Sequence, residues 1–178
     1  MSRVLCVLLL TAASASYAAP SQKTDDMDAL LADRGLLSHV EHVRQTIKSQ
    51  TSEVVMGAMG FLGVPYRRGG NSAESGFDCS GFIRAIYGQT VGLLLPRRAD
   101  EQAAATEKID RKELKPGDLV FFKTMRSAFS HVGMYVGENK FIHAPKPGAE
   151  VRVEDMDIRY WKTRFTGARR VVQETGGE

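Results

Sequence analysis

The sequence predicts an α+β fold in which helices come first and an antiparallel β-sheet follows. In the first half of the chain, apolar residues recur at helical spacing in two stretches, residues 52–62 and the segment that begins at Cys79. From Lys115 onward the pattern changes to short apolar runs separated by turns, which is typical of antiparallel strands. Helices followed by a run of strands favour α+β over an alternating α/β arrangement.

Length and composition indicate one globular domain. The chain has 178 residues, enough for a hydrophobic core, and its 43% hydrophobic and 25% charged residues are ordinary. The net charge of +3 is too small to indicate a nucleic-acid partner, although it suits an anionic polymer. The pair Arg169-Arg170 is interpreted as solvated surface. We therefore expect no nucleic-acid binding.

The first 18 residues have the pattern of a secretory signal peptide. Arg3 precedes an apolar run from Val4 to Leu10, and the small residues Ser16 and Ala18 fit a cleavage site. The apolar run is too short to span a membrane, and no later stretch qualifies. We therefore expect an exported protein, in the periplasm or cell envelope or secreted, without stable membrane insertion.

The segment after the predicted signal peptide is less regular. Residues 19–46 are polar and acidic at first and contain few apolar residues, so we expect a linker with marginal helices. The folded domain is expected over residues 47–175. Its first helix is predicted over residues 52–62, where an apolar stripe runs up to Gly63, which can end the helix.

The best-defined predicted helix begins at Cys79. Asp78 fits the N-cap position, and an apolar stripe at helical spacing continues to Gly88, which can end the helix. Residues 63–76 contain prolines and paired glycines that exclude regular structure, so this stretch is predicted to be a shaped loop. A further short helix is predicted over residues 99–105.

The second half of the chain carries the predicted sheet. Five short apolar or alternating runs are bounded by turn residues, and each is long enough for one strand. The predicted strands cover residues 119–122, 131–137, 140–144, 150–153 and 167–172.

Cysteine usage points to a reactive thiol. Cys6 lies within the predicted signal peptide, so the mature chain would keep Cys79 alone and form no internal disulfide. Such a lone thiol is inert and buried, paired with another molecule, or catalytic. At a helix start, free N–H groups and the helix dipole favour a thiolate, so we expect a low pKa for Cys79.

A thiol nucleophile needs a base and a group that orients the base. His39 and His42 lie in the weak N-terminal segment and are interpreted as solvated surface, whereas His131 and His143 lie on neighbouring predicted strands. A three-residue loop between these strands would set His143 opposite Gly133 and place both histidines on one face of the sheet. A two-residue turn would put them on opposite faces unless a bulge corrects the register.

Six short motifs follow in the order found in NlpC/P60 cell-wall cysteine peptidases, and the chain resembles this family over about residues 50–173. The motifs are Val64-Pro65-Tyr66 with Gly69-Gly70, Asp78-Cys79-Ser80-Gly81, Leu95-Pro96-Arg97, Pro116-Gly117-Asp118-Leu119, His131-Val132-Gly133 and Phe141-Ile142-His143-Ala144.

The resemblance implies a papain-like α+β fold, with N-terminal helices packed on an antiparallel β-sheet and the nucleophile at a helix start. It also implies an enzyme without a cofactor that hydrolyses peptidoglycan stem peptides, typically at the γ-D-glutamyl–diamino-acid bond. By position, Cys79 would be the nucleophile, His131 the general base and His143 the residue that orients His131.

Four further positions match substrate-binding residues of the family. Tyr66 would bind substrate or stabilise the oxyanion near the cysteine. Asp78 and Ser80 match residues that contact the free amine of a stem peptide in some members. Arg97 matches a recurrent arginine, either structural or in contact with substrate. The pair Arg67-Arg68 departs from many relatives, which leaves the substrate preference open.

Other functions stay open at this point. The same scaffold could serve an N-acetylmuramoyl-alanine amidase or another thiol acyl hydrolase. Cys79, His131 and His143 could instead ligate zinc, with one position open. A third alternative is a non-catalytic wall-binding module. The sequence gives no prediction of oligomeric state.

Overall fold

A computed structural model describes residues 36–172. The predicted signal peptide at residues 1–18 and the predicted linker up to residue 35 lie outside the described residues. The compact unit that carries the site begins at Arg44. Within residues 36–172, no helix is long and apolar enough to cross a membrane.

The first described helix is longer than the sequence predicts. Helix α2 spans Leu36–Met59, so it begins well before Ser52 and ends before Leu62. The hydroxyl of Ser52, the first residue of the predicted helix, donates a hydrogen bond to the Lys48 carbonyl one turn earlier, as a serine inside a helix does. After Met59 the chain passes through tight turns to Gly63, whose positive φ of 82° stops the helical path.

Helix α3 (Cys79–Val91) begins where predicted but ends later. The Asp78 side chain accepts a hydrogen bond from the Gly81 N–H, as expected for an N-cap. Gly88 continues the helix, and Gly92 ends it in the left-handed conformation, where its N–H bonds to the Tyr87 carbonyl. Helix α4 spans Ala99–Ala104, close to prediction.

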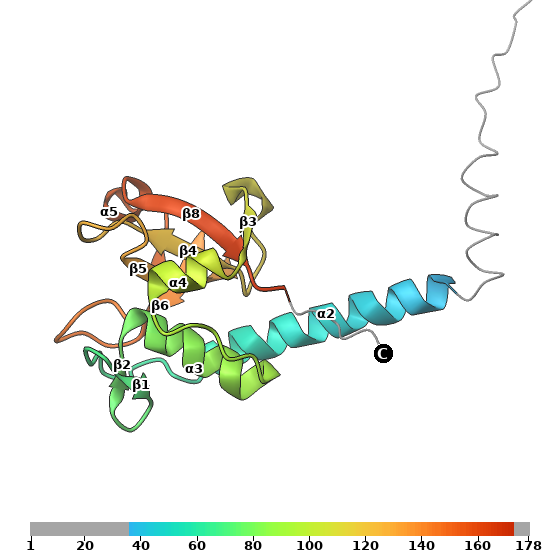
Figure 1. Cartoon of the computed structure of the whole chain (residues 1–178), viewed down its shortest axis with the longest axis horizontal. Coiled ribbons are helices and arrows are strands. Elements are labelled where there is room, and N and C mark those ends of the chain that lie inside the picture. Colours follow the sequence, from blue (N-terminus) through green and yellow to red (C-terminus); the bar gives the residue numbers. More distant parts are fainter. Residues whose placement is uncertain (1–35, 173–178) are drawn as a thin grey trace, which may run out of the picture. The chain divides into compact units, whose positions relative to one another are not determined.

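The six strands of the main sheet are antiparallel and follow the order β3-β8-β4-β5-β6-β7 (Figure 1). Their bounds are β3 Glu107–Ile109, β4 Leu119–Phe122, β5 His131–Gly137, β6 Lys140–His143, β7 Arg152–Asp155 and β8 Phe165–Arg170. The α+β prediction is confirmed, although β3 was not predicted. Also unpredicted are the small hairpin β1 (Asn71–Ser72) and β2 (Gly76–Phe77), the 3₁₀ turn Arg111–Glu113 and helix α5 (Arg159–Lys162).

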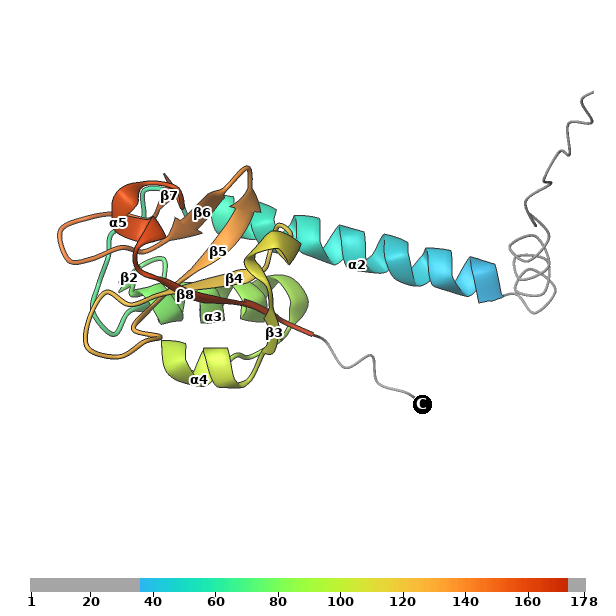
Figure 2. The same ribbon diagram turned by 90° about the horizontal axis from the view of Figure 1, so that it is seen from above.

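Both faces of the sheet are covered. Side chains of β4 alternate, so Leu119 and Phe121 pack in the cluster that contains the apolar stripe of α3. Val120 and Phe122 point the other way and pack with Trp161 of α5. Figure 2 shows α3 and α5 on opposite sides of the sheet. This double burial explains why β4 is apolar at four consecutive positions.

The interpretation of Arg169-Arg170 as solvated surface is wrong. The guanidinium of Arg170 donates two hydrogen bonds, of 2.8 and 2.6 Å, to the buried carboxylate of Asp118. Arg169 donates to the Ala103 carbonyl at the end of α4. Strand β8 is therefore tied by charge to the turn before β4 and by a hydrogen bond to α4.

The connection between β5 and β6 determines which face each histidine occupies. It is a two-residue turn, Glu138 and Asn139, both with positive φ, and Gly137 pairs with Lys140. The register then shifts by one residue, so that Tyr135 pairs with Phe141 and Met134 with Ile142. The three-residue loop is therefore wrong, and the alternative of a two-residue turn with a bulge is confirmed.

Close backbone approach at the start of α3 explains the glycine of the Asp-Cys-Ser-Gly motif. The Gly70 carbonyl accepts a hydrogen bond from the Asp78 N–H, and a Cβ added to Gly81 would lie 2.1 Å from that same oxygen. Gly81→Ala should therefore push the Gly70 loop away and lower the free energy of unfolding by about 1–3 kcal/mol. Urea denaturation of both proteins measures this difference.

Gly88→Ala is the matched control for this prediction. A Cβ at Gly88, on the same helix, would meet only Leu94 Cδ1 at 3.9 Å, which is ordinary contact. Because alanine has the higher helix propensity, this variant should be as stable as the wild type or more stable, by up to about 1 kcal/mol. Equal denaturation midpoints for the two variants would contradict the close approach at Gly81.

Candidate active site

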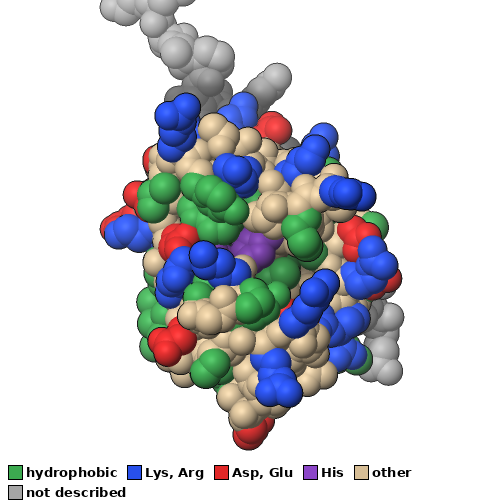
Figure 3. Space-filling view, turned by 90° about the vertical axis from the view of Figure 1, so that its left-hand side faces the viewer, with side chains coloured by type: hydrophobic (Ala, Val, Ile, Leu, Met, Phe, Trp, Pro, Cys, Tyr) green, Lys and Arg blue, Asp and Glu red, His purple; other side chains and the backbone are tan. Residues whose placement is uncertain are grey.

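Cys79 opens α3 and lines a cavity of about 1010 Å³. The cavity is also lined by Tyr66 from the loop before β1, by His131 from the start of β5 and by Trp161 from α5. The space-filling view shows a hollow with a histidine at its bottom and apolar and basic side chains around its rim (Figure 3). The predicted nucleophile and base therefore share one accessible depression.

The two histidines lie at the same end of adjacent strands, because β5 begins at His131 and β6 ends at His143. His131 Nε2 lies 2.7 Å from His143 Nδ1, a hydrogen-bond distance, and both rings are buried. Gly133 leaves the room for this pair, since a Cβ there would lie 3.2 Å from His143 Cβ and 2.6 Å from Phe141 Cδ2. The bulge thus brings both imidazoles to one face of the sheet.

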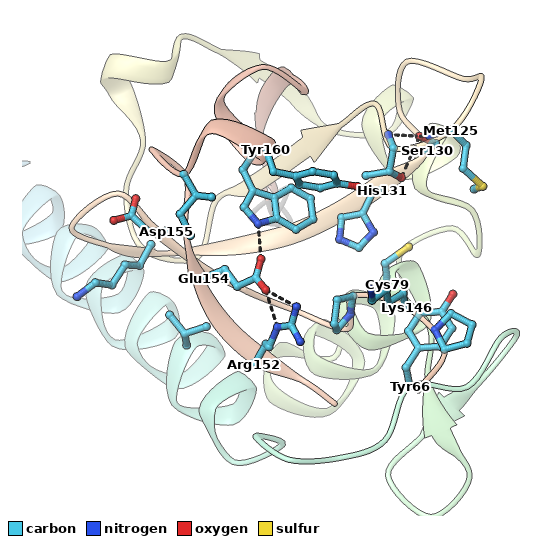
Figure 4. A pocket seen from close by; sticks show the side chains of 17 residues that line it. Tyr66, Cys79, Met125, Ser130, His131, Lys146, Arg152, Glu154, Asp155 and Tyr160 are labelled. Carbon is cyan, nitrogen blue, oxygen red and sulfur yellow. Dashed lines mark hydrogen bonds and ion pairs between the residues drawn. The ribbon is translucent and has the colours of Figure 1, made fainter. Parts of the chain in front are cut away.

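Three further side chains complete the surroundings of the histidine pair, and Figure 4 labels two of them, Arg152 and Glu154, together with His131. His143 Nε2 faces Glu154 Oε2 at 3.6 Å. The indole N–H of Trp161 donates to the same carboxylate, and its ring stacks on His131 with centroids 5.5 Å apart. The guanidinium of Arg152 donates to the other oxygen of Glu154.

Sequence reasoning did not assign Arg152, Glu154 or Trp161 to the site. Trp161 is the one tryptophan of the chain, which was a weak signal. Arg152 and Glu154 alternate along β7, and Arg152 pairs with His143 across the strands. That period-two pattern indicates that Arg152 and Glu154 share a face of the strand but not which face it is. Their place beside the histidines could therefore be seen only in the folded structure.

The predicted amine-binding residues are engaged with one another. The Asp78 carboxylate caps α3 by accepting a hydrogen bond from the Gly81 N–H, and it accepts another from the Gly69 N–H at 2.9 Å. It also accepts two hydrogen bonds from Arg97, of 2.9 and 2.6 Å. Arg97 also donates to the Ser80 hydroxyl at 2.9 Å. These three residues form an ion-paired cluster at the base of the Cys79 helix, whereas Tyr66 alone of the four lines the cavity of Cys79.

The electrostatics of the buried groups differ from the expectation for an activated thiolate. Burial raises the pKa of Cys79, and the backbone N–H groups of Val132, Ser80 and Cys79 act against it without cancelling it. The predicted low pKa is therefore wrong for this state of the molecule. Burial and the neighbouring His143 lower the pKa of His131, so thiol and imidazole are both neutral.

Two other groups in the site have shifted pKa values. The contact with His143 is the main reason that the pKa of Glu154 falls to about 2, so this group is a carboxylate at any neutral pH. Burial and the nearby Cys79 raise the pKa of Tyr66, so its hydroxyl keeps its proton and can donate a hydrogen bond. The cavity therefore offers a neutral thiol, a neutral base and a phenolic donor.

The zinc alternative finds no support in the arrangement of the side chains. Across residues 36–172, no three His, Cys, Asp or Glu side chains converge as metal ligands. His131 Nε2 and His143 Nδ1 hydrogen-bond to each other, so neither of these two nitrogens is available to bind a metal ion.

The model of the NlpC/P60 family matches residues 63–170, more than half of the chain and all of the site described above. The chain belongs to the NlpC/P60 family. The resemblance predicted from the six motifs is thereby confirmed.

Two relatives indicate the range of named activities within the NlpC/P60 family. The chain is 45% identical over 114 residues to the murein DD-endopeptidase MepH of Escherichia coli, in a match that covers 62% of this chain and 42% of the relative. It is 41% identical over 118 residues to a gamma-DL-glutamyl hydrolase of Bacillus subtilis, covering 66% and 28%. The match therefore spans less than half the length of either relative.

Solved NlpC/P60 structures share the fold. A Staphylococcus aureus protein of the family, described as similar to lipoprotein, superposes with a TM-score of 0.64 at 36% identity, covering 71% of this chain and 42% of that one. The NlpC/P60 domain of the peptidoglycan hydrolase SagA superposes with a TM-score of 0.61 at 32% identity, covering 68% and 98%. Almost the whole SagA domain thus has a counterpart here.

Proposed function

We propose that this protein is an exported cysteine endopeptidase that hydrolyses peptidoglycan stem peptides. The observation that carries the proposal is the 2.7 Å contact between His131 and His143 beside Cys79, in a chain of the NlpC/P60 family. The names of the relatives, a murein endopeptidase and a glutamyl hydrolase, support the substrate class. They also support a location outside the cytoplasm, where the wall peptides are.

The proposed reaction begins with proton transfer from the Cys79 thiol to His131. Nε2 of His131 faces His143, so Nδ1 is the nitrogen that acts as base. The sulfur then attacks the scissile carbonyl carbon, and the oxygen takes up negative charge. The backbone N–H of Cys79 at the helix start and the Tyr66 hydroxyl are the donors proposed to stabilise that oxyanion.

Bond cleavage returns the proton. His131, now an imidazolium, gives its proton to the leaving amine nitrogen as the C–N bond breaks, which leaves a thioester on Cys79. Water then loses a proton to His131 and attacks the thioester carbon, and the sulfur leaves and regains that proton. His143 accepts a hydrogen bond from His131 throughout and keeps the ring in plane with the sulfur.

Two bonds are candidates for cleavage. The family resemblance favours the γ-D-glutamyl–diamino-acid bond, whereas the relative at 45% identity is named a DD-endopeptidase, which acts on D,D-linkages. The Asp78 carboxylate is held by Arg97 and two backbone N–H groups, so a free substrate amine would have to displace one of them. This arrangement favours stem peptides whose amino end is already bonded to the glycan.

Mass analysis of digested muropeptides tests the proposal. Cleavage of the γ-D-glutamyl bond should release a peptide that begins with the diamino acid, and D,D-cleavage should convert dimers to monomers. An amidase would instead release the whole stem peptide from the muramic acid. The Cys79→Ala protein is the control, and a chelator should leave the rate unchanged. Release of the intact stem peptide, or loss of activity in chelator, would contradict the proposal.

The rate of hydrolysis should form a broad plateau in pH. Because the pKa of His131 is lowered, the base stays neutral as the pH falls below 6.5, the ordinary imidazole value. Because the pKa of Cys79 is raised, the thiol keeps the proton that the leaving amine needs even above about pH 8.5, the ordinary thiol value. The acid limb of the profile should therefore lie below pH 6.5 and the alkaline limb above about pH 8.5. The measurement is kcat/KM on a defined stem peptide between about pH 4 and 10.

Circular dichroism at each pH serves as the control, since unfolding must not be mistaken for titration. An acid limb with its midpoint at or above 6.5 would show that His131 is not the buried neutral base.

A further inference from the structure

Glu154 is the one carboxylate that meets the buried histidine pair among the described residues. It extends from β7, its side chain is 18% exposed, and one of its oxygens faces His143 Nε2 at 3.6 Å. That nitrogen is buried and has no hydrogen-bond partner within residues 36–172. The distance is slightly longer than that of a hydrogen bond, so the contact between the carboxylate and the ring is electrostatic.

The carboxylate is fixed in place by two donors. The Trp161 indole N–H donates to the oxygen that faces His143, and the Arg152 guanidinium donates to the other oxygen. An ionised carboxylate can only accept hydrogen bonds. Glu154 therefore presents a fixed negative charge and an acceptor to Nε2 of His143.

This acceptor decides where the protons of both rings lie. Nε2 of His143 must carry the hydrogen, because a bare nitrogen lone pair facing a carboxylate is repelled. Neutral His143 then has an unprotonated Nδ1, which can only accept, so Nε2 of His131 must donate across the 2.7 Å contact. Neutral His131 is left with an unprotonated Nδ1.

We propose that Glu154 is a positioning residue that sets the tautomer of both histidines and so leaves His131 Nδ1 free to take the thiol proton. The inference rests on the proposed function, in which His131 is the base for Cys79. When His131 becomes positively charged, the fixed carboxylate stabilises that charge through His143. Glu154 acts through two rings and does not touch the reacting atoms.

The two charged groups beside the histidine pair, Glu154 and Arg152, have opposite effects on the protonation of the imidazoles. Glu154 and Arg152 come from β7, His131 and His143 from β5 and β6, and Cys79 from α3. The carboxylate favours the protonated imidazoles, whereas the positive charge of Arg152 disfavours the protonated form of His143. Removing each charge should therefore move the acid limb of the pH profile in a different direction.

The test compares Glu154→Gln with Arg152→Gln. In Glu154→Gln, kcat should fall about 10–100-fold with little change in KM, as for other groups that orient a catalytic ring. Its acid limb should move to lower pH, since the imidazoles are then protonated less readily. Arg152→Gln keeps the carboxylate, should lose less activity, and should move the acid limb to higher pH. Glu138→Gln, an exposed carboxylate on the β5–β6 turn, is the matched control and should behave as wild type.

A second measurement does not depend on activity. Long-range ¹H–¹⁵N NMR of the histidine rings at neutral pH should show His131 with its proton on Nε2 in the wild type and a mixture of tautomers in Glu154→Gln. An unchanged tautomer together with an unchanged rate in Glu154→Gln would overturn the inference, and an acid limb that moves the same way in both variants would do so too. If Cys79→Ala hydrolyses stem peptides, the proposed function fails instead, whatever the tautomers.

Discussion

Replacing Cys79 with alanine is expected to abolish hydrolysis while the fold stays intact. Loss of the attacking atom of a catalytic triad lowers kcat by about 10⁵–10⁶ in comparable enzymes, because the remaining groups act as a unit with it. The thiol is small and partly buried between the core and the cavity, and the α3 cap depends on Asp78 and not on the thiol. The melting temperature should therefore change by only a few degrees, roughly what a stability change of about 1 kcal/mol produces.

Iodoacetamide labelling followed by mass spectrometry counts the reactive thiols in the wild type and in Cys79→Ala. A mature chain that has lost Cys6 should take one label on Cys79, and Cys79→Ala should take none. Two labels on the wild type would show that the predicted signal peptide is retained. Hydrolysis by a properly folded Cys79→Ala protein would remove Cys79 from the mechanism.

The two histidines should contribute unequally. His131→Ala removes the base and should lower kcat by about 10³-fold or more, within the range attributed to a general base and its triad. His143→Ala should have a smaller effect, and His143→Asn or His143→Gln should recover part of the loss because each can still accept a hydrogen bond from His131 Nε2. The double variant should be no worse than His131→Ala alone, since both changes disable one unit.

Single-turnover cleavage of a defined stem peptide measures these rates. His39→Ala and His42→Ala, both on α2, are the controls and should leave the rate unchanged. A His131→Ala protein as active as the wild type would mean that the base is elsewhere. A His143→Asn protein no better than His143→Ala would mean that the contact between the rings is not what orients His131.

Local signals predicted the elements that carry the site. The cap at Asp78, the stripe after Cys79 and the apolar run of β4 each depend on residues close in sequence, and each forms as predicted. The ends of the helices were predicted less accurately. Gly88 and Gly92 are both glycines near the end of the stripe, and the sequence does not say which of them adopts the left-handed conformation.

The parts that were not predicted depend on contacts between distant segments. The partners of the histidine pair come from β7 and α5, and nothing near His131 or His143 in the sequence points to Glu154 or Trp161. The thiol pKa was wrong for a similar reason. A helix start favours the thiolate, but the burial that outweighs it is created by the packed sheet and loops around Cys79.

The bulge between Tyr135 and Gly137 has a consequence for how the length of this chain can vary. Adding or deleting one residue in the β5–β6 connection would turn His143 to the opposite face of the sheet, with every named residue still present. Changes of two residues would restore the facing. The number of residues between the two histidines can therefore change by two, but not by one, without moving His143 off the face that His131 occupies.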